Sequence, residues 1–282
     1  MKNKKNLSEL DDLPPLRDVI EAHDLRAQKA LGQNFLLDQN ITDKIVRESG
    51  DFDGVYVFEI GPGPGGLTRS LLKSAAKKVI AIEFDPRAVA ALQDLQARAG
   101  ERLDIHHGDA LAVDLPAMVP EPRAIVANLP YNIATPLLIN WLKDMRKNQN
   151  TYGFMSLMFQ KEVADRICAP PGGKAYGRLS VMAQWLCDVR VIYDLPPSAF
   201  TPPPKVRSAV VHFVPKTLPS DAPSFAAVEK ITEAAFGQRR KMIRSSLKKY
   251  IGAIEALGLD PTSRAENLKV EDFINLAKLL KI

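Results

Sequence analysis

The chain has 282 residues, of which 46% are hydrophobic and 25% charged, and its net charge is +5. This composition excludes a disordered chain and a disulfide-stapled mini-protein, since Cys168 and Cys187 are the only cysteines, and it predicts one large domain with a smaller one. We expect a reducing, cytoplasmic location and assign no metal, because no apolar run suits a signal peptide or membrane span and neither cysteine has ligand-spaced neighbours.

Short β-branched runs alternate with longer segments of helical periodicity from about residue 55 to residue 214. This alternation predicts β-α-β units and a parallel sheet covered by helices. The runs expected to form strands are Val55–Ile60, Val79–Ile82, Leu103–Ile105, Ala124–Ala127, Phe154–Met158, Val189–Tyr193 and Ala209–Val214. A Pro-rich connection separates the last two, which favours an antiparallel edge strand. The sequence therefore predicts a doubly wound, Rossmann-like α/β fold.

After Pro215 the strand signals stop, and residues 216–223 have the composition of a linker. Farther on, Ile243, Leu247 and Ile251 are spaced by four residues. This spacing predicts one helix with an apolar stripe and basic residues on the neighbouring stripe. We therefore expect three segments: an N-terminal extension over 1–24, an α/β domain over 25–215 and a small helical domain over 216–282.

The positive charge lies in the last third of the chain. Residues 200–282 hold 14 Lys/Arg and 8 Asp/Glu, whereas residues 1–199 hold 24 and 25. Six cations and no acid lie between Phe236 and Tyr250: Arg239, Arg240, Lys241, Arg244, Lys248 and Lys249. A polyanion such as RNA is the natural partner of this segment, and a solvated helix face is the alternative.

The first predicted strand is followed by a glycine-rich turn. Glycines at a strand-to-helix turn let the backbone approach a bound nucleotide at the carboxyl end of a sheet. Gly61, Gly63 and Gly66 match the G-x-G-x-x-G spacing, which does not by itself distinguish NAD from S-adenosylmethionine. Pro62 and Pro64 lack the N–H groups that would bind a pyrophosphate. They favour a cofactor without phosphates.

Acidic residues follow the next two predicted strands. Glu83 ends the second strand, and Asp85 and Pro86 are suited to cap and begin the helix after it. An acid at that strand end can accept both ribose hydroxyls of an adenosine cofactor. Asp109, after the third strand, could accept a hydrogen bond from the cofactor's adenine amine. Each acid alone could be a helix cap or a surface charge, but together with the glycine turn they favour nucleoside binding.

The run Asn128-Leu129-Pro130-Tyr131 follows the fourth predicted strand. An adenine amine is a poor nucleophile, because its lone pair is delocalised into the ring. Hydrogen bonds to the Asn128 side-chain oxygen and to a carbonyl such as that of Leu129 would aim the lone pair, and such positioning contributes roughly 7–11 kcal/mol. The Tyr131 ring offers a face for stacking. In isolation, the run is equally compatible with a plain Asn-x-Pro turn.

With these motifs the chain resembles the KsgA/RsmA ribosomal RNA adenine dimethyltransferases, a family that also includes the Erm resistance methylases. The resemblance begins at about residue 25 and is carried by 31–36, 59–65, Glu83, 108–110, 128–131, 200–206 and 236–241. It implies S-adenosylmethionine as cofactor. It also implies N6,N6-dimethylation of two adjacent adenosines in the 3′-terminal hairpin loop of 16S rRNA, within the small subunit or its precursor, by a monomer.

The resemblance further implies residue roles. The cofactor would be held by Asn34, Leu36, Gly61, Gly63, Glu83, Asp109, Ala110 and Asn128. The target base would be held by Asn128, Leu129, Tyr131 and Phe200, with Phe200 stacked on the flipped base opposite Tyr131. Arg239, Arg240, Lys241, Arg244 and Lys248 would bind RNA. Three alternatives stay open: an Erm-like 23S rRNA methylase, an RNA-binding assembly factor with a vestigial site, and an NAD-dependent oxidoreductase.

Overall fold

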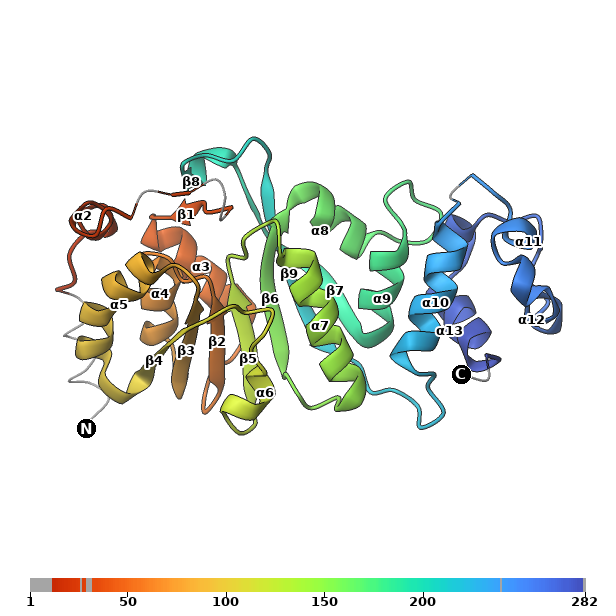
Figure 1. Ribbon diagram of the computed structural model, residues 1–282, viewed down its shortest axis with the longest axis horizontal. Coiled ribbons are helices and arrows are strands. Elements are labelled where there is room, and N and C mark those ends of the chain that lie inside the picture. Colours follow the sequence, from red (N-terminus) through yellow and green to blue (C-terminus); the bar gives the residue numbers. More distant parts are fainter. Residues whose placement is uncertain (1–11, 26, 29–31, 239, 281–282) are drawn as a thin grey trace. The chain divides into compact units, whose positions relative to one another are not determined.

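The computed structural model describes residues 12–25, 27–28, 32–238 and 240–280. Its main sheet has seven strands in the order β4-β3-β2-β5-β6-β9-β7 (Figure 1). These strands are β2 (Tyr56–Ile60), β3 (Lys78–Glu83), β4 (Leu103–His107), β5 (Arg123–Ala127), β6 (Phe154–Gln160), β7 (Cys187–Leu195) and β9 (Ser208–Pro215). Each apolar run expected to be a strand forms one, which confirms the α/β prediction.

The antiparallel strand does not lie at the edge of the sheet. Strands β2 to β6 pair in parallel with their neighbours, and β9 pairs antiparallel with β6. Because β9 lies between β6 and β7, the predicted edge position is wrong. After β7 the chain leaves this sheet through the Pro-rich connection, where β8 (Phe200–Thr201) pairs with β1 (Phe35–Leu36), before it returns as β9.

The helices of the first half of the chain are α2 (Leu16–Ala22), α3 (Gln39–Ser49), α4 (Gly66–Lys73), α5 (Pro86–Ala99), α6 (Leu115–Met118) and α7 (Ala134–Lys147). Those of the second half are α8 (Lys161–Cys168), α9 (Arg178–Leu186), α10 (Phe225–Phe236), α11 (Ile243–Ser246), α12 (Ile251–Ala256) and α13 (Val270–Lys278). As expected, Asp85 caps α5 by accepting the Arg87 N–H, and Pro86 is its first residue. None of the helices described is long and apolar enough to cross a membrane.

The chain forms two compact units, each assembled from segments that are not consecutive in the sequence. Unit 1 comprises residues up to 138 together with 150–161 and 191–213, and unit 2 comprises 139–149, 162–190 and 214–282. These units divide the chain at other places than the segments expected from the sequence, because elements that pack together come from separate parts of the chain. The segment boundaries after residues 24 and 215 stay a prediction.

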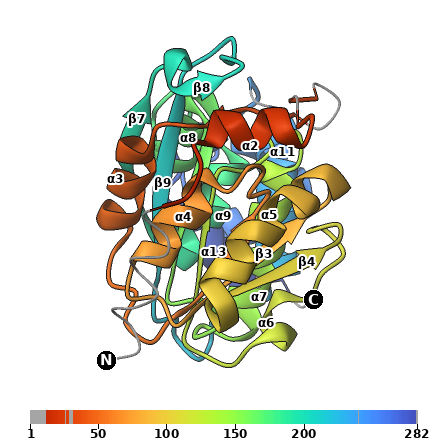
Figure 2. The ribbon, with the colours of Figure 1, turned by 90° about the vertical axis from the view of Figure 1, so that its left-hand side faces the viewer.

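The main core of unit 1 lies between the sheet and the helices α3, α4 and α5. Leu71 of α4 and Leu92 of α5 belong to one buried cluster with Val79 of β3. The N-terminal segment adds a smaller cluster, in which the fully buried Leu25 meets α5. Figure 2 shows α2, which precedes Leu25, beside α5. These contacts hold Leu25, and Phe35 of β1, against α5.

Unit 2 is held together by α9, α10 and α13, which pack against one another. Phe236 at the end of α10 stacks on Phe273 of α13, with ring centroids 5.4 Å apart. Tyr176 meets the edge of Phe236 at 6.0 Å. An aromatic cluster therefore precedes the basic segment in this unit.

The single helix predicted through the basic segment is wrong. α11 ends at Ser246, a 3-10 turn covers Lys248–Tyr250, and α12 begins at Ile251. The Ile243 N–H donates to the Ser263 carbonyl instead of starting a longer helix. The predicted apolar stripe holds at two of its positions, because Ile243 and Leu247 are fully buried, and fails at Ile251, which is 39% exposed.

Candidate functional site

Unit 1 contains a cavity of about 250 Å³ where β2, β3, β4 and β5 end. Its wall consists of the turns after these strands and of the segment 32–36. Parallel strands bring their carboxyl ends to one edge of the sheet, so residues far apart in sequence meet there. The predicted site residues that line the cavity are Asn34, Leu36, Gly61, Gly63, Glu83, Asp109, Ala110, Asn128, Leu129 and Tyr131. Their individual roles stay predictions.

The glycine turn is shaped by the close approach of β1. Gly63 has a φ of 54°, and a Cβ there would lie 2.8 Å from the Phe35 ring. A Cβ on Gly66, the first residue of α4, would lie 2.4 Å from the Leu36 carbonyl oxygen. Glycine is required at both positions because a side chain would push β1 off the turn. These two contacts bring the segment 32–36 over the cavity.

Glu83 is fixed at the edge of the cavity by backbone donors. Its Oε1 accepts the N–H groups of Phe84 and Asp85, each at 2.8 Å, and its Oε2 accepts that of Gly63 at 3.1 Å. The side chain is 5% exposed, and burial raises the pKa of its carboxyl against the effect of these hydrogen bonds. The turn after β2 and the end of β3 are thereby joined through one carboxyl group.

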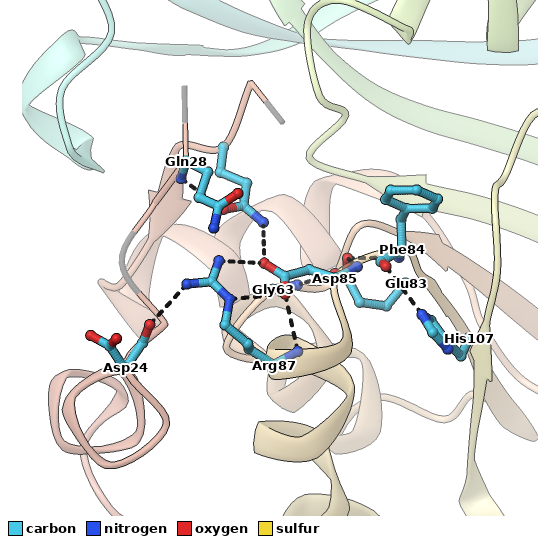
Figure 3. Close-up of polar contacts among 9 residues, drawn as sticks. Asp24, Gln28, Gly63, Glu83, Phe84, Asp85, Arg87 and His107 are labelled. Carbon is cyan, nitrogen blue, oxygen red and sulfur yellow. Dashed lines mark hydrogen bonds and ion pairs between the residues drawn. The ribbon is translucent and has the colours of Figure 1, made fainter. Parts of the chain in front are cut away.

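Asp85 joins the same strand end to the N-terminal segment (Figure 3). Its carboxylate accepts Nη2 of Arg87 at 2.7 Å and Nε2 of Gln33 at 3.2 Å. The Arg87 hydrogen bond lowers the pKa of Asp85 most. Arg87 also donates from Nη1 to the Asp24 carbonyl at 2.9 Å. Asp85 is therefore more than the predicted helix cap, because it orients the segment that forms one wall of the cavity.

The end of the fourth predicted strand presents an oriented amide. Nδ2 of Asn128 donates to the Asn34 carbonyl at 2.9 Å. Oδ1 of the same amide remains available as an acceptor, since no group that the structure describes donates a hydrogen bond to it. Tyr131 lines the cavity, and its hydroxyl lies 2.6 Å from Oγ of Ser208. Burial raises the pKa of Tyr131.

Glu59 and Phe84 are among the cavity residues to which the sequence analysis gave no role. Glu59, the fourth residue of β2, is 2% exposed, and burial raises the pKa of its carboxyl to about 8. Phe84 is 61% exposed although it lines the cavity. The signals for both were in the sequence: Glu59 precedes the glycine turn, and Phe84 follows the strand-end acid. The sequence could not show that Glu59 is buried and Phe84 exposed, because both depend on the tertiary structure.

The lining of the cavity is acidic. Its ionisable carboxyl side chains are Glu59, Glu83 and Asp109, and no Lys, Arg or His occurs among the described residues of its wall. Such a lining attracts a cation and disfavours an anion. Across the described ranges, no three His, Cys, Asp or Glu residues are grouped so that they could hold a metal ion.

Phe200 does not line the cavity. It pairs with Leu36 between β8 and β1, is 3% exposed, and packs in the main core of unit 1 with Val210. Its ring is therefore used as an anchor of the Pro-rich connection in this structure. Stacking on a target base stays a prediction that requires the ring to leave the core.

The predicted RNA-binding cations are exposed in unit 2. Arg240, Lys241, Arg244 and Lys248 all have exposed side chains. None of them forms an ion pair within the part of the chain that the structure covers. Arg239 lies outside the described residues. Four positive charges thus stand in solvent without a neutralising partner.

Comparisons with known proteins give one consistent result. The model of the family described as "Ribosomal RNA adenine dimethylase" matches residues 24–281. A protein of Agrobacterium fabrum named ribosomal RNA small subunit methyltransferase A is 53% identical over 280 residues, which are 97% of this chain and 100% of that protein. A protein of the same name from Sinorhizobium medicae is 54% identical over 278 residues, with 97% and 100% covered.

Two solved structures are also similar over most of the chain. A dimethyladenosine transferase from Plasmodium falciparum has a TM-score of 0.72 and 27% identity, and the match covers 85% of this chain and 94% of that one. The 23S rRNA methyltransferase ErmE has a TM-score of 0.66 and 25% identity, with 86% and 98% covered. The similarity therefore includes both the sheet and the segments outside it.

Proposed function

Because the chain belongs to the ribosomal RNA adenine dimethylase family, we propose that it transfers methyl groups from S-adenosylmethionine to N6 of adenosines in small-subunit rRNA. The full proposal is dimethylation of two adjacent adenosines in the 3′-terminal hairpin loop of 16S rRNA, by a cytoplasmic monomer acting on the small subunit or its precursor. The relatives named for the small subunit are 53% and 54% identical, against 25% for ErmE, which favours the small subunit.

The observation that carries the proposal is the acidic cavity that ends at Asn128 and Tyr131. NAD brings a pyrophosphate with two negative charges, which no cation among the described lining residues would balance. S-adenosylmethionine instead carries a sulfonium and an ammonium group against a single carboxylate, so its net charge is positive, and when bound it supplies an electrophilic methyl group. The donor set of the cavity therefore fits this cofactor and argues against the oxidoreductase alternative.

The adenosine part of the cofactor has partners at two strand ends. The Glu83 carboxyl, held by three backbone N–H groups, has remaining lone pairs that can accept ribose hydroxyls. Asp109 uses Oδ1 for the Leu111 N–H, which leaves Oδ2 for an adenine amine. The exposed Phe84 ring offers a face for the adenine. Ribose and base would thus be recognised by separate side chains.

The target amine would be aligned at Asn128. Oδ1 of Asn128 and the Leu129 carbonyl can each accept one of its N–H groups, which draws the amine out of conjugation and points its lone pair into the cavity. The Tyr131 ring would stack on the base. The carboxamide cannot act as a strong base, so these residues would work by alignment, and the amine proton would pass to solvent water.

The cofactor assignment is tested by titration calorimetry with S-adenosylmethionine and with NAD. We expect only S-adenosylmethionine to bind, and we expect Glu83→Ala to weaken that binding by roughly 1–3 kcal/mol, because an acceptor for the ribose is lost. Glu48→Ala, at an exposed glutamate of α3, is the control and should bind like the wild type. Tighter binding of NAD would refute the cofactor, and unchanged affinity in folded Glu83→Ala would refute the ribose role.

A further inference from the structure

Glu59 is an acidic residue buried in the wall of the cavity. It lies near the carboxyl end of β2, lines the cavity, and is 2% exposed. Its Oε2 has no hydrogen-bond partner among the described residues. A buried carboxylate oxygen without a donor is unfavourable, whereas a protonated carboxyl is neutral and far less costly to bury. The structure therefore favours the protonated form when the cavity holds no cation.

The charged groups around Glu59 reinforce this preference. From β3, the acidic Glu83 raises the pKa of the Glu59 carboxyl, and burial raises it more. From α4, contact with Thr68 lowers it, while Arg69 of the same helix donates from Nη1 to the Pro14 carbonyl at 2.8 Å. From the end of β5, Asn128 is neutral. Together these effects raise the pKa of Glu59 to about 8, which favours the protonated form at pH 7.

We propose that Glu59 is a proton switch of the cofactor site, which keeps its proton while the cavity lacks a cation and releases it to solvent when the cationic methionine end of the cofactor binds. The inference rests on the proposed cofactor. The described lining residues carry no positive charge, whereas this ligand does. The ionised Glu59 then balances it in a site of low polarity, where such an attraction is strong.

Proton release makes the affinity depend on pH in a definite direction. Below the pKa of free Glu59, the cation must displace a proton, so each unit of falling pH weakens binding by up to about tenfold. Above that pKa, the displaced proton is already gone and the effect levels off. The cationic cofactor should therefore bind more tightly as pH rises from 6 to 7.5. An α-amino group itself titrates only at about 7.7–8.0, so the ligand stays charged over most of this range.

Titration calorimetry in phosphate and in Tris at pH 7 measures the released protons, because these buffers take up protons with different heats. We expect S-adenosylmethionine to release between half and one proton per site. Methylthioadenosine, which has neither cationic group, should release almost none. S-adenosylhomocysteine keeps the ammonium and the carboxylate but has no sulfonium, so release with it identifies the ammonium as the cation, and release with S-adenosylmethionine alone identifies the sulfonium.

The matched variants are Glu59→Gln and Glu48→Gln. Glu59→Gln keeps the shape of the protonated acid but cannot ionise, so it should bind S-adenosylmethionine at least tenfold more weakly and release no proton. Glu48→Gln, at an exposed position, should behave as the wild type. Equal proton release by Glu59→Gln and the wild type would overturn the inference, because another acid such as Glu83 would then be the source.

If Glu59→Gln does not fold, the pH dependence of cofactor binding by the wild type tests the proton switch. The dissociation constant for S-adenosylmethionine should fall about tenfold between pH 6 and pH 7, while that for methylthioadenosine changes little. A constant affinity for S-adenosylmethionine over this range overturns the proton switch but leaves the proposed function intact. Failure to bind S-adenosylmethionine at any pH refutes the proposed function itself.

Discussion

Tyr131 makes two kinds of contact that substitutions can separate. The residue lines the cavity, and its hydroxyl lies 2.6 Å from Oγ of Ser208, the first residue of β9. The hydrogen bond ties the turn after β5 to the end of the Pro-rich connection. We infer that the ring stacks on the target base and that the hydroxyl, through Ser208, fixes the position of the ring.

We expect Tyr131→Phe to retain much of the methylation rate, because it keeps the ring and loses one hydrogen bond of about 1 kcal/mol. Tyr131→Ala should lose the stacking surface as well, worth roughly 1–3 kcal/mol. Single-turnover methylation of unmethylated small subunits measures both. Ser208→Ala breaks the same hydrogen bond and should match Tyr131→Phe. Equal losses for the Phe and Ala variants would show that the ring face has no role.

The cavity residues were largely predictable from the sequence, because strand-end motifs must converge at one edge of a parallel sheet. This reasoning placed Glu83, Asp109 and Asn128 together, as the structure does. It could not give Glu59 a role, since an acid before a glycine turn becomes informative only when its burial and its unsatisfied oxygen are known. Nor could it foresee that Phe200 would be held in the core by pairing of β8 with β1.

At the scale of elements, the contact between β1 and α4 shapes the cavity. Gly66→Ala places a methyl group where the Leu36 carbonyl oxygen lies 2.4 Å away, and that atom belongs to backbone that cannot rotate aside. β1 must then shift together with Asn34, which accepts the Asn128 amide. We expect the variant to bind S-adenosylmethionine at least tenfold more weakly and to have a lower Tm, measured by calorimetry and thermal unfolding.

The control for this prediction is Gly252→Ala. Gly252 lies in α12, and a Cβ there meets nothing within 4 Å, so the change should leave cofactor affinity unchanged. It should even stabilise the helix slightly, since alanine has the higher helix propensity. If Gly66→Ala binds the cofactor as tightly as Gly252→Ala does, the approach of β1 to α4 does not control the cavity.

The strands were predicted well, because hydrophobic periodicity determines them. The helix through the basic segment was predicted poorly, because backbone groups there form hydrogen bonds with a distant segment. The apolar runs gave the strands, because buried β-branched runs have few alternatives. The spacing of Ile243, Leu247 and Ile251 could not reveal that residues 261–264 bond the backbone at the start of α11. The place of β9 inside the sheet likewise depends on the path of the whole Pro-rich connection.

At the scale of the molecule, charge is distributed unevenly. The exposed cations between residues 240 and 248 of unit 2 stand without ion-pair partners in the described structure. We expect Arg240→Ala/Arg244→Ala to bind RNA more weakly and with a smaller salt dependence, because fewer counterions are released. Binding assays with small-subunit RNA at several salt concentrations measure both, and cofactor affinity should hardly change.

The matched control removes two exposed charges from unit 1, as Arg47→Ala/Lys73→Ala. This variant has the same net charge as the first, so a general electrostatic effect would weaken RNA binding equally in both. We expect the loss to be larger for Arg240→Ala/Arg244→Ala. If RNA binding by the two variants and the wild type depends equally on salt concentration, the basic segment is solvated surface and does not bind RNA.

The central claim is that the cavity methylates adenosine N6 in small-subunit rRNA through alignment by Asn128. The most direct test is methylation of purified, unmethylated small subunits with methyl-labelled S-adenosylmethionine, followed by mapping of the label. The account predicts two methyl groups on each of two adjacent adenosines in the 3′-terminal hairpin loop, and little label with a folded Asn128→Ala variant that still binds RNA. Label elsewhere, or near-wild-type methylation by Asn128→Ala, would contradict it.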